Sequence, residues 1–321
     1  MDDLKNKVVV ITGASSGVGK AMALEFAKYG AKLVLAARRI EALHEVAEEC
    51  RELGGTAEAV ECDTRISQDV QVLAKVAYES GNAIDVWINN AGVLAAGALD
   101  EVPSTINENV IRTNLLGYMN GAQEALPYFK SQGHGVLINN ISVGGWFPVP
   151  YATAYSASKF GLRGFSEALK GEVSKYPGIH IVDIFPGFLD TPGIQHAANY
   201  TGKVLKPAPP VSDPRRVARA VVKLVKNPSS RKTIGIASGL LRMSYAVVPR
   251  IARGITGMVI RKYLKQADDI DHTSGNVLRP VDYGTGIDGG WRNKGVSREA
   301  TIAMMIFAGV ATGLYYARSR K

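Results

Sequence analysis

The feature that most constrains the fold is a strand, a glycine-rich turn and a helix that follow one another without a gap. Residues 7–11 (KVVVI) form an apolar β-branched run, typical of a strand buried on both faces. Residues 12–19 (TGASSGVG) form the turn, and residues 20–30 then carry apolar side chains at helical spacing. Glycines let a backbone approach a pyrophosphate closely, and a helix N-terminus attracts anions. The three pieces predict a nucleotide-binding corner, whereas a glycine-rich turn alone is often only structural.

The same alternation of strand and helix continues along the chain. It predicts an α/β fold with a doubly wound parallel sheet of the Rossmann type, in three α/β/α layers and with a C-terminal helical extension. Ligands of such sheets bind beyond the carboxyl ends of the strands. We expect one long helix over 107–129, and further strands over 32–37, 56–63, 85–92, 135–142, 179–187 and 232–238.

The end of the second expected strand predicts the choice of cofactor. Ala37, Arg38 and Arg39 stand where NAD-specific folds carry an acidic residue for the ribose hydroxyls. A guanidinium can pair with a 2′-phosphate bidentately, so we predict NADP(H) as the cofactor. The alternative is that both arginines are merely solvated. Asp63, at the end of the third strand, is well placed to reach an adenine amino group.

Tyr155 and Lys159, in YSASK, lie one helical turn apart on one face of a predicted helix. A nearby ammonium favours the ionised phenol, so we expect Lys159 to lower the Tyr155 pKa from its ordinary value of about 10. Such a phenol can exchange a proton with a carbonyl or alcohol oxygen while a hydride moves. By itself the pattern is more often a half-exposed helix face.

Several motifs in order now resemble a short-chain dehydrogenase/reductase, over roughly residues 5–235. They are TGASSGVG, NNAG at 89–92, Asn114, Ser142, YSASK, and PG followed by Thr191. The resemblance implies that Tyr155 is the acid in reduction and the base in oxidation, and that Ser142 hydrogen-bonds the substrate oxygen. It implies that Lys159 lowers the Tyr155 pKa and holds the nicotinamide ribose. Asn114, at a break in its helix, would hold a water that relays protons to Lys159.

The resemblance also implies which residues hold NADP(H). The glycine-rich turn would cradle the diphosphate, and the two arginines would contact the 2′-phosphate. The later residues would contact the adenine, the ribose and the carboxamide. In chain order these residues are Gly13, Ser15, Ser16, Gly17, Val18, Gly19, Arg38, Arg39, Asp63, Thr64, Asn90, Ala91, Gly92, Tyr155, Lys159, Pro186, Gly187 and Thr191.

A proline-rich loop over 188–214 is the expected substrate loop and is typical of a mobile lid. Aromatic and apolar residues just before the catalytic tyrosine are expected to line a hydrophobic pocket, and His196 is expected on the loop surface. Lipid, sterol and retinoid substrates all remain open, and we predict no metal site. The residues expected at the substrate are Ser142, Trp146, Phe147, Val149, Pro150, Tyr151 and Tyr155.

The net charge of +9 is concentrated in the last third of the chain. Residues 215–321 hold 20 Lys and Arg but only 6 Asp and Glu. Residues 239–266 mix large apolar residues with arginines and lack acidic residues, which suits an anionic membrane surface. The alternative is that residues 239–266 form a helical pair that covers the substrate pocket. The segment can also do both. Nucleic acid is not an expected partner, because base-recognition motifs are absent.

The chain is expected to end in a membrane anchor. After the catalytic domain (1–238) and the basic amphipathic helical segment (239–266), we predict a polar linker over 267–298 and a transmembrane helix over 299–318. A buried helix in a homo-oligomer is the alternative for the last segment. No signal peptide is expected, and Cys50 and Cys62 are expected as buried thiols, so we expect the catalytic domain in the cytoplasm.

The leading hypothesis is an NADP(H)-dependent oxidoreductase that interconverts a hydrophobic carbonyl and its alcohol. The alternative is a non-catalytic nucleotide-sensing or scaffold protein on the same fold. The complete set of Asn114, Ser142, Tyr155 and Lys159 argues against the alternative. Oligomers are common in the family that the chain resembles, so a homo-oligomer is expected by analogy only.

Overall fold

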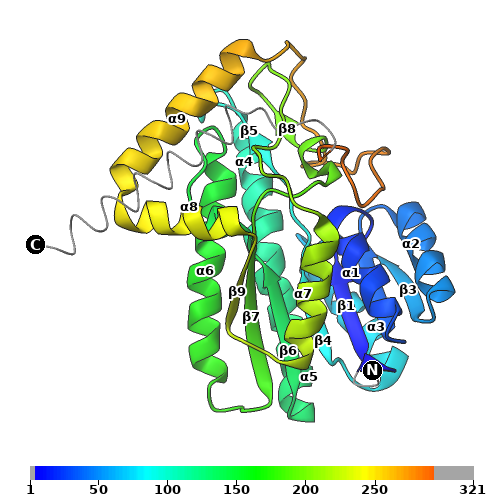
Figure 1. Cartoon of the computed structure of the whole chain (residues 1–321). Coiled ribbons are helices and arrows are strands. Elements are labelled where there is room, and N and C mark those ends of the chain that lie inside the picture. The colour runs from blue at the N-terminus through cyan, green and yellow to red at the C-terminus, as the bar shows by residue number, and fades with distance from the viewer. Residues whose placement is uncertain (1–3, 293–321) are drawn as a thin grey trace, which may run out of the picture.

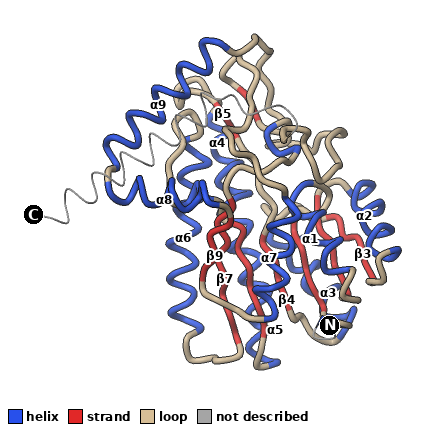
Figure 2. Tube along the Cα trace, in the orientation of Figure 1, coloured by secondary structure: helices blue, strands red, loops and turns tan. Residues whose placement is uncertain are grey.

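The computed structural model describes residues 4–292 and is built around a seven-stranded parallel sheet (Figures 1 and 2). The strand order is β3-β2-β1-β4-β6-β7-β9, so the direction of winding reverses between β1 and β4. A crevice forms at such a reversal, beyond the carboxyl ends of the strands. The strands are β1 (Val8–Thr12), β2 (Lys32–Ala37), β3 (Thr56–Glu61), β4 (Val86–Asn89), β6 (Gly135–Asn140), β7 (Ile179–Pro186) and β9 (Arg231–Ile234).

Helices cover both faces of the sheet because alternate strand residues point to opposite sides. On β1, Val9 and Ile11 pack with α1, α2 and α7, whereas Val8 and Val10 pack with α3, α5 and α6. The predicted three-layer, doubly wound fold is therefore confirmed. The helices of the two layers are α1 (Gly17–Ala27), α2 (Ile40–Glu52), α3 (Ser67–Gly81), α5 (Gly117–Gln132), α6 (Thr153–Val173) and α7 (Pro214–Lys226).

The long helix expected over 107–129 is interrupted where the site needs it. A π-helical turn, η2 (Arg112–Leu116), joins α4 (Ser104–Ile111) to α5. Asn114 lies in the middle of this turn, which matches the expected break. π-turns of this kind occur often at functional sites.

The predicted last strand is shorter than expected. Gly235 adopts a φ of 99°, which a residue with a side chain rarely adopts, and β9 therefore ends at Ile234 rather than at Ser238. Two helices follow, α8 (Ile236–Val247) and α9 (Pro249–Gln266), with a break at Val248. No helix within residues 4–292 is long and apolar enough to cross a membrane. The predicted anchor at 299–318 lies outside the described residues.

The expected substrate loop is partly ordered by a second, two-stranded sheet. Strand β8 (Ala198–Asn199) pairs in parallel with β5 (Ala95–Ala96), and the short 3₁₀ turn η4 (Pro192–Ile194) precedes it. The loop ends at Asp213, whose side chain caps α7 by accepting a hydrogen bond from Arg215 N at 2.9 Å. Residues 188–214 are thus held at several points.

The described part of the predicted polar linker, 267–292, does not behave as a linker. It runs from the end of α9 back across the molecule toward the N-terminal ends of α1 and α2 (orange in Figure 1). Thr273 exchanges two backbone hydrogen bonds with Asn199, and Val277 is fully buried in an apolar cluster with Val93 and Ala198. Tertiary contacts, rather than local periodicity, order this segment.

Candidate active site

One cavity of about 740 Å³ lies at the carboxyl ends of the strands and gathers nearly all the predicted site residues. Its volume falls in the range of small-molecule and cofactor sites, roughly 300–1,000 Å³. Asn114 and Trp146 are the two predicted residues that do not border it. Those that do are Gly13, Ser15, Ser16, Gly17, Val18, Gly19, Arg38, Arg39, Asp63, Thr64, Asn90, Ala91, Gly92, Ser142, Phe147, Val149, Pro150, Tyr151, Tyr155, Lys159, Pro186, Gly187 and Thr191.

The glycine-rich turn after β1 is held against the turn after β4. The Thr12 hydroxyl accepts hydrogen bonds from the backbone N–H groups of Asn90 (2.9 Å) and Ala91 (3.1 Å). Gly13 has a φ of 67°, and a Cβ built there would lie 2.7 Å from the Cα of Ala91. A Cβ on Gly19 would lie 2.1 Å from Gly13 O. These glycines are therefore required for the close approach of the two turns and of α1.

Arginines crowd the adenosine end of the cavity. The Arg38 guanidinium donates to the backbone oxygens of Asn276 and Val277, and that of Arg39 donates to Val281 O. Burial lowers the Arg38 pKa from its ordinary value; nearby Asp63 raises it and nearby Arg65 lowers it. Asp63 does not extend freely toward an adenine, because its carboxylate is ion-paired with Arg65. Arg65 was not predicted, since nothing local distinguishes it from a solvated arginine.

Three of the four catalytic residues expected from the resemblance come from α6 and from the turn after β6. Tyr155 and Lys159 lie on α6, and Ser142 lies just after β6 with a φ of 89° and a ψ of 158°. The Ser142 hydroxyl oxygen accepts a hydrogen bond from Gly144 N at 3.2 Å. A side chain at Gly144 would clash with the catalytic tyrosine, because a Cβ there would lie 2.9 Å from Cε1 of Tyr155.

The expected lowering of the Tyr155 pKa is not found. Burial raises the Tyr155 pKa from its ordinary value, and the Ser142 side chain lowers it less than burial raises it. Lys159 is only 4% exposed, and burial lowers its pKa to about 7. Both groups are thus biased toward their neutral forms, because desolvation disfavours charge on either one. Sequence spacing placed the pair correctly but could not reveal their burial.

Asn114 uses its side chain to hold the backbone of Val93. The Asn114 Oδ1 accepts from Val93 N at 2.8 Å, and its Nδ2 donates to Val93 O at 2.8 Å. The Nδ2 also donates to the Ser158 hydroxyl at 3.3 Å. The side chain therefore links η2 to the turn after β4 and to α6. Its expected role in a proton relay remains a prediction.

Trp146 does not line the pocket, contrary to expectation. Its ring packs against Phe185, with centroids 5.3 Å apart, and the guanidinium carbons of Arg163 and Arg242 lie 3.5 and 4.1 Å from the ring centroid. Phe147, the next residue, does border the cavity and contacts the ring of Tyr245. The short 3₁₀ turn η3 (Val143–Gly145) directs these neighbouring side chains to different places.

The far half of the cavity is an apolar arm between the substrate loop and the C-terminal helices. Helices α8 and α9 line it, which confirms the alternative that residues 239–266 form a helical pair covering the pocket. His196 also borders the cavity, contrary to its expected place on the surface; it is 7% exposed, and its Nε2 pairs with Tyr283 O at 3.1 Å. Burial lowers the His196 pKa below its ordinary value. The arm is lined by Leu205, Pro207, Pro209, Leu241, Ile255, Val259, Ile260 and Leu264.

Comparison with known proteins agrees with this fold. The profile of the family described as short chain dehydrogenase matches residues 7–200. An uncharacterized oxidoreductase of Bacillus subtilis (strain 168), YxnA, is 32% identical over 324 residues, covering 97% of this chain and 89% of that protein. The chain therefore belongs to the short-chain dehydrogenase family, and it is an oxidoreductase of that family.

Two further proteins are similar over parts of the chain. The 11-beta-hydroxysteroid dehydrogenase A of Sesamum indicum is 38% identical over 193 residues, covering 59% of this chain and 54% of that protein. An alcohol dehydrogenase of the archaeon Thermococcus sibiricus, solved with 5-hydroxy-NADP, is 27% identical and superposes with a TM-score of 0.63. The superposition covers 72% of this chain and 96% of the Thermococcus sibiricus chain.

The cavity has the donors and acceptors that a dinucleotide needs. Two buried oxygens, Thr113 Oγ1 and Asn276 Oδ1, border it without a hydrogen-bond partner among the described residues. Such atoms are costly unless a ligand or water satisfies them. Cationic side chains at one end, the N-terminus of α1 in the middle and Lys159 at the other end match the charges along a nicotinamide dinucleotide phosphate. The residues present therefore fit the group.

Proposed function

We propose that the protein is an NADP(H)-dependent short-chain dehydrogenase/reductase that interconverts a hydrophobic carbonyl compound and its alcohol. One observation carries the proposal: a single cavity borders the glycine-rich turn, the Tyr155–Lys159 pair and an apolar arm. A cofactor in the first part and a substrate in the last part would meet at Tyr155.

The cofactor is proposed to lie along the carboxyl ends of β1, β2 and β4. Gly13, Ser15, Ser16, Gly17, Val18 and Gly19 would hold the diphosphate at the N-terminus of α1. Arg38 and Arg39 would pair with the 2′-phosphate in exchange for their present backbone partners. When bound, NADP(H) supplies or accepts the hydride. The complex of the related Thermococcus sibiricus enzyme with 5-hydroxy-NADP supports this choice of cofactor.

The protein's own residues would move the proton. Tyr155 donates its hydroxyl proton to the substrate oxygen in reduction and takes a proton back in oxidation. Ser142 donates a hydrogen bond to the same oxygen as negative charge develops on it. The raised pKa keeps the Tyr155 phenol protonated at neutral pH, so the proton that reduction needs is in place. Lys159 would hold the nicotinamide ribose and, in its charged form, would stabilise the phenolate left behind.

A hydrophobic substrate is proposed because the arm is apolar. Leu205, Leu241, Ile255 and Ile260 come from the substrate loop, α8 and α9, and enclose it from different sides. Burying an apolar group there is worth roughly 25 cal/mol per Å². The sesame relative, named as a hydroxysteroid dehydrogenase, supports a lipophilic substrate but does not select a steroid over a retinoid or an alkyl aldehyde.

An activity screen tests the proposal. NADPH and NADH consumption would be followed with a panel of apolar aldehydes and ketones, and the reverse reaction with long-chain and cyclic alcohols. We expect turnover with NADPH and poor turnover with short polar carbonyls. Binding of NADPH without turnover of any carbonyl or alcohol would instead favour a nucleotide-sensing or scaffold protein.

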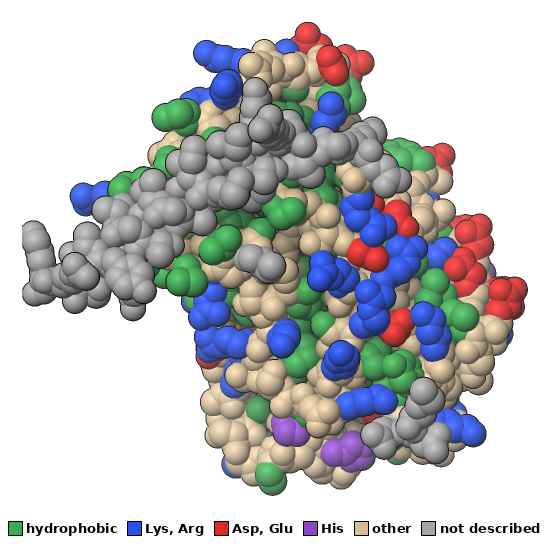
Figure 3. Space-filling model, in the orientation of Figure 1, with side chains coloured by type: hydrophobic (Ala, Val, Ile, Leu, Met, Phe, Trp, Pro, Cys, Tyr) green, Lys and Arg blue, Asp and Glu red, His purple; other side chains and the backbone are tan. Residues whose placement is uncertain are grey.

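We also propose that the C-terminal third contacts membrane lipid. Residues 236–266 hold six Lys and Arg and no acidic residue, and α9 exposes Met258 and Val259. Figure 3 shows acidic side chains over α2 and also at the top, beyond the end of α9. The full-length protein should sediment with membranes after a high-salt wash, and deletion of residues 299–321 should release it. Full recovery of the intact chain in the supernatant would contradict the proposal.

A further inference from the structure

Residues 268–292, which we call the strap, lie along the loops at the carboxyl ends of the sheet strands. The strap begins beside the substrate loop, where Lys203 pairs with Asp269 at 2.6 Å. It then passes His196, whose backbone oxygen accepts from Asn276 N at 2.8 Å. Val277 is the buried apolar anchor of this part. The strap therefore lies on the fold along its length rather than connecting two separate parts.

The strap meets the adenosine end of the cavity through its backbone oxygens. The oxygens of Asn276 and Val277 accept from Arg38, and that of Val281 accepts from Arg39. Gly286 O accepts from Gly17 N, at the start of α1, at 2.9 Å. These donors are the ones proposed above for the cofactor's phosphates. The strap thus faces the cofactor site directly.

Asn276 carries an unused hydrogen-bond acceptor at this place. Its side-chain oxygen is buried and has no partner within residues 4–292, and the residue borders the cavity. A buried acceptor without a donor is unfavourable. The adenosine part of a dinucleotide offers amino and hydroxyl donors that would satisfy it.

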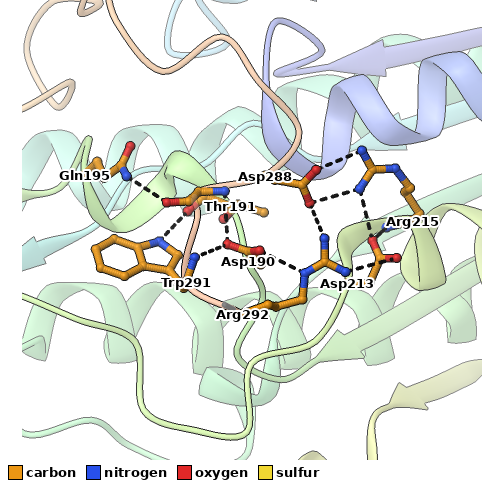
Figure 4. Close-up of polar contacts among 9 residues, drawn as sticks. Asp190, Thr191, Gln195, Asp213, Arg215, Asp288, Trp291 and Arg292 are labelled. Carbon is orange, nitrogen blue, oxygen red and sulfur yellow. Dashed lines mark hydrogen bonds and ion pairs between the residues drawn. The ribbon is translucent and has the colours of Figure 1, made fainter. Parts of the chain in front are cut away.

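Arg292 fixes the far end of the strap to the substrate loop (Figure 4). Its Nε donates to Asp190 Oδ2 at 2.9 Å, its Nη2 to Asp288 Oδ1 at 2.6 Å, and its Nη1 lies 3.3 Å from Asp213 Oδ2. Asp190 also accepts from Trp291 N at 2.7 Å. Burial alone would raise the Asp190 pKa. Hydrogen bonds from the backbone N–H groups of Trp291 and Arg292 and from the Arg292 side chain outweigh burial, so the pKa lies below its ordinary value. An ionised carboxylate beside Thr191 therefore holds the strap.

We propose that the strap is the outer wall of the cofactor site, with Asn276 as a cofactor-binding residue and Arg292 as a positioning residue that holds the wall in place. This inference rests on the proposed NADP(H) function. The adenosine end of the cofactor lies between the sheet and the strap, so the strap must lift before the cofactor leaves. Arg292 acts on binding through Asp190, Asp213 and Asp288 and does not touch the cofactor.

Substitutions at Asn276 test the binding role. Affinities for NADPH and NADH would be measured by nicotinamide fluorescence. Asn276→Ala removes the acceptor and should weaken both cofactors by a similar factor, about 3- to 10-fold. Asn276→Asp keeps the acceptor but adds negative charge near Arg38, and should weaken NADPH at least 10-fold more than NADH. Asp282→Asn, an exposed change on the same strap, should alter neither affinity.

The outcomes separate the two proposals. Wild-type affinities in both Asn276 variants would overturn the binding role of Asn276. An equal loss of NADPH and NADH in Asn276→Asp would also overturn it, because a purely structural role predicts no charge dependence. If wild-type protein binds neither cofactor, the proposed function itself fails, which is a different result.

The positioning role is tested by the rate of cofactor release. In stopped-flow displacement, Arg292→Gln should release NADPH at least 5-fold faster than wild type, and limited proteolysis of the cofactor-free protein should cut the strap sooner. Arg279→Gln, at an exposed arginine of the same strap, is the control and should change neither. If Arg292→Gln does not fold, Asp288→Asn removes one arm of the network and should give a smaller change in the same direction. Faster proteolysis with an unchanged release rate would overturn the proposal.

Discussion

The ammonium nitrogen of Lys159 lies 5.8 Å from the ring centroid of Tyr155; the Lys159 side chain is buried, and that of Tyr155 is half-buried at the cavity. The same nitrogen lies 5.0 Å from the ring of Tyr118 and donates to Asn140 O at 3.2 Å. Two aromatic rings and one carbonyl thus surround the ammonium. No carboxylate within residues 4–292 pairs with this ammonium, so burial lowers its pKa without an opposing ion pair.

Replacing Tyr155 by Phe should abolish turnover and leave cofactor binding intact. General acid catalysis contributes roughly 10²–10⁴-fold, so we expect at least that loss in kcat, with the NADPH Kd within about 2-fold of wild type. In wild type the raised pKa predicts reduction that is nearly independent of pH from about 6 to 9, and oxidation that rises across that range.

Tyr118→Phe is the matched control for this prediction. Tyr118 is 1% exposed and does not border the cavity, and its hydroxyl donates to the backbone oxygen of Asn140 at 2.9 Å. We expect some loss of stability, about 1 kcal/mol, and no loss of kcat beyond about 3-fold. Retained turnover in Tyr155→Phe would disprove the acid/base assignment.

Replacing Lys159 by Met should stabilise the cofactor-free protein at low pH. The folded pKa of about 7 lies below the ordinary 10.5, so the folded state binds fewer protons than the unfolded state between these values. Stability of wild type therefore rises with pH across this window, by about 1.4 kcal/mol per pH unit, and is lowest below pH 7. The advantage of the variant should be largest near pH 6 and vanish near pH 10.

Urea unfolding at pH 6, 7.5 and 9 would measure this effect. Asn140 O keeps the Tyr118 hydroxyl as a donor after the change, so no buried acceptor is orphaned. Lys75→Met, at a lysine whose side chain is 72% exposed, should show no such pH dependence. A variant less stable than wild type at every pH would contradict the burial argument. Turnover should be lost in Lys159→Met in any case.

Ser142 should report both backbone strain and catalysis. Its φ of 89° and ψ of 158° fall in a region that is essentially restricted to glycine and costs about 1–3 kcal/mol for other residues. Ser142→Gly and Ser142→Ala both remove the hydroxyl and should both lose activity. Only the glycine relieves strain, so we expect Ser142→Gly to be more stable than Ser142→Ala by about 1 kcal/mol in thermal or urea unfolding. Equal stabilities would show that no strain is stored there.

Replacing Arg38 by Gln should shift cofactor preference toward NADH. A charge-assisted hydrogen bond contributes roughly 1.5–3 kcal/mol, so the NADPH affinity should fall about 10- to 100-fold while the NADH affinity changes little. Fluorescence titration with both cofactors measures the ratio. Arg112→Gln, at an exposed arginine of η2 paired with Glu108, is the control. An unchanged ratio of the NADPH and NADH affinities would show that Arg38 contacts the strap but not the 2′-phosphate.

Local sequence patterns were sufficient for the sheet and for most of the site. β-branched apolar runs specify buried strands, and glycines mark turns that a Cβ would block, as at Gly13 and Gly19. Because parallel strands place their carboxyl ends at one edge, residues at those ends could be assigned to one crevice without knowing the contacts. Helical spacing put Tyr155 and Lys159 on one helix face, but only the resemblance to the family marked them as catalytic.

The directions of individual side chains near the site could not be read from the chain. Trp146 and Phe147 are adjacent, yet one packs beside two arginines and the other borders the cavity. A 3₁₀ turn has no periodicity that a short sequence reveals. His196 was assigned to the surface for a related reason, since its burial depends on Tyr283 from a distant segment.

The sequence by itself determined the family, the parallel sheet and the identity of the residues that meet at its edge, because these depend on local periodicity and on short motifs. Only the tertiary structure decided the protonation balance at Tyr155 and Lys159 and the course of residues 268–292. Burial depends on every segment that packs around a group, and the contact of Arg38 with Asn276 joins residues 238 positions apart. A polar, glycine-rich stretch looks like a linker until the partners of its backbone are known.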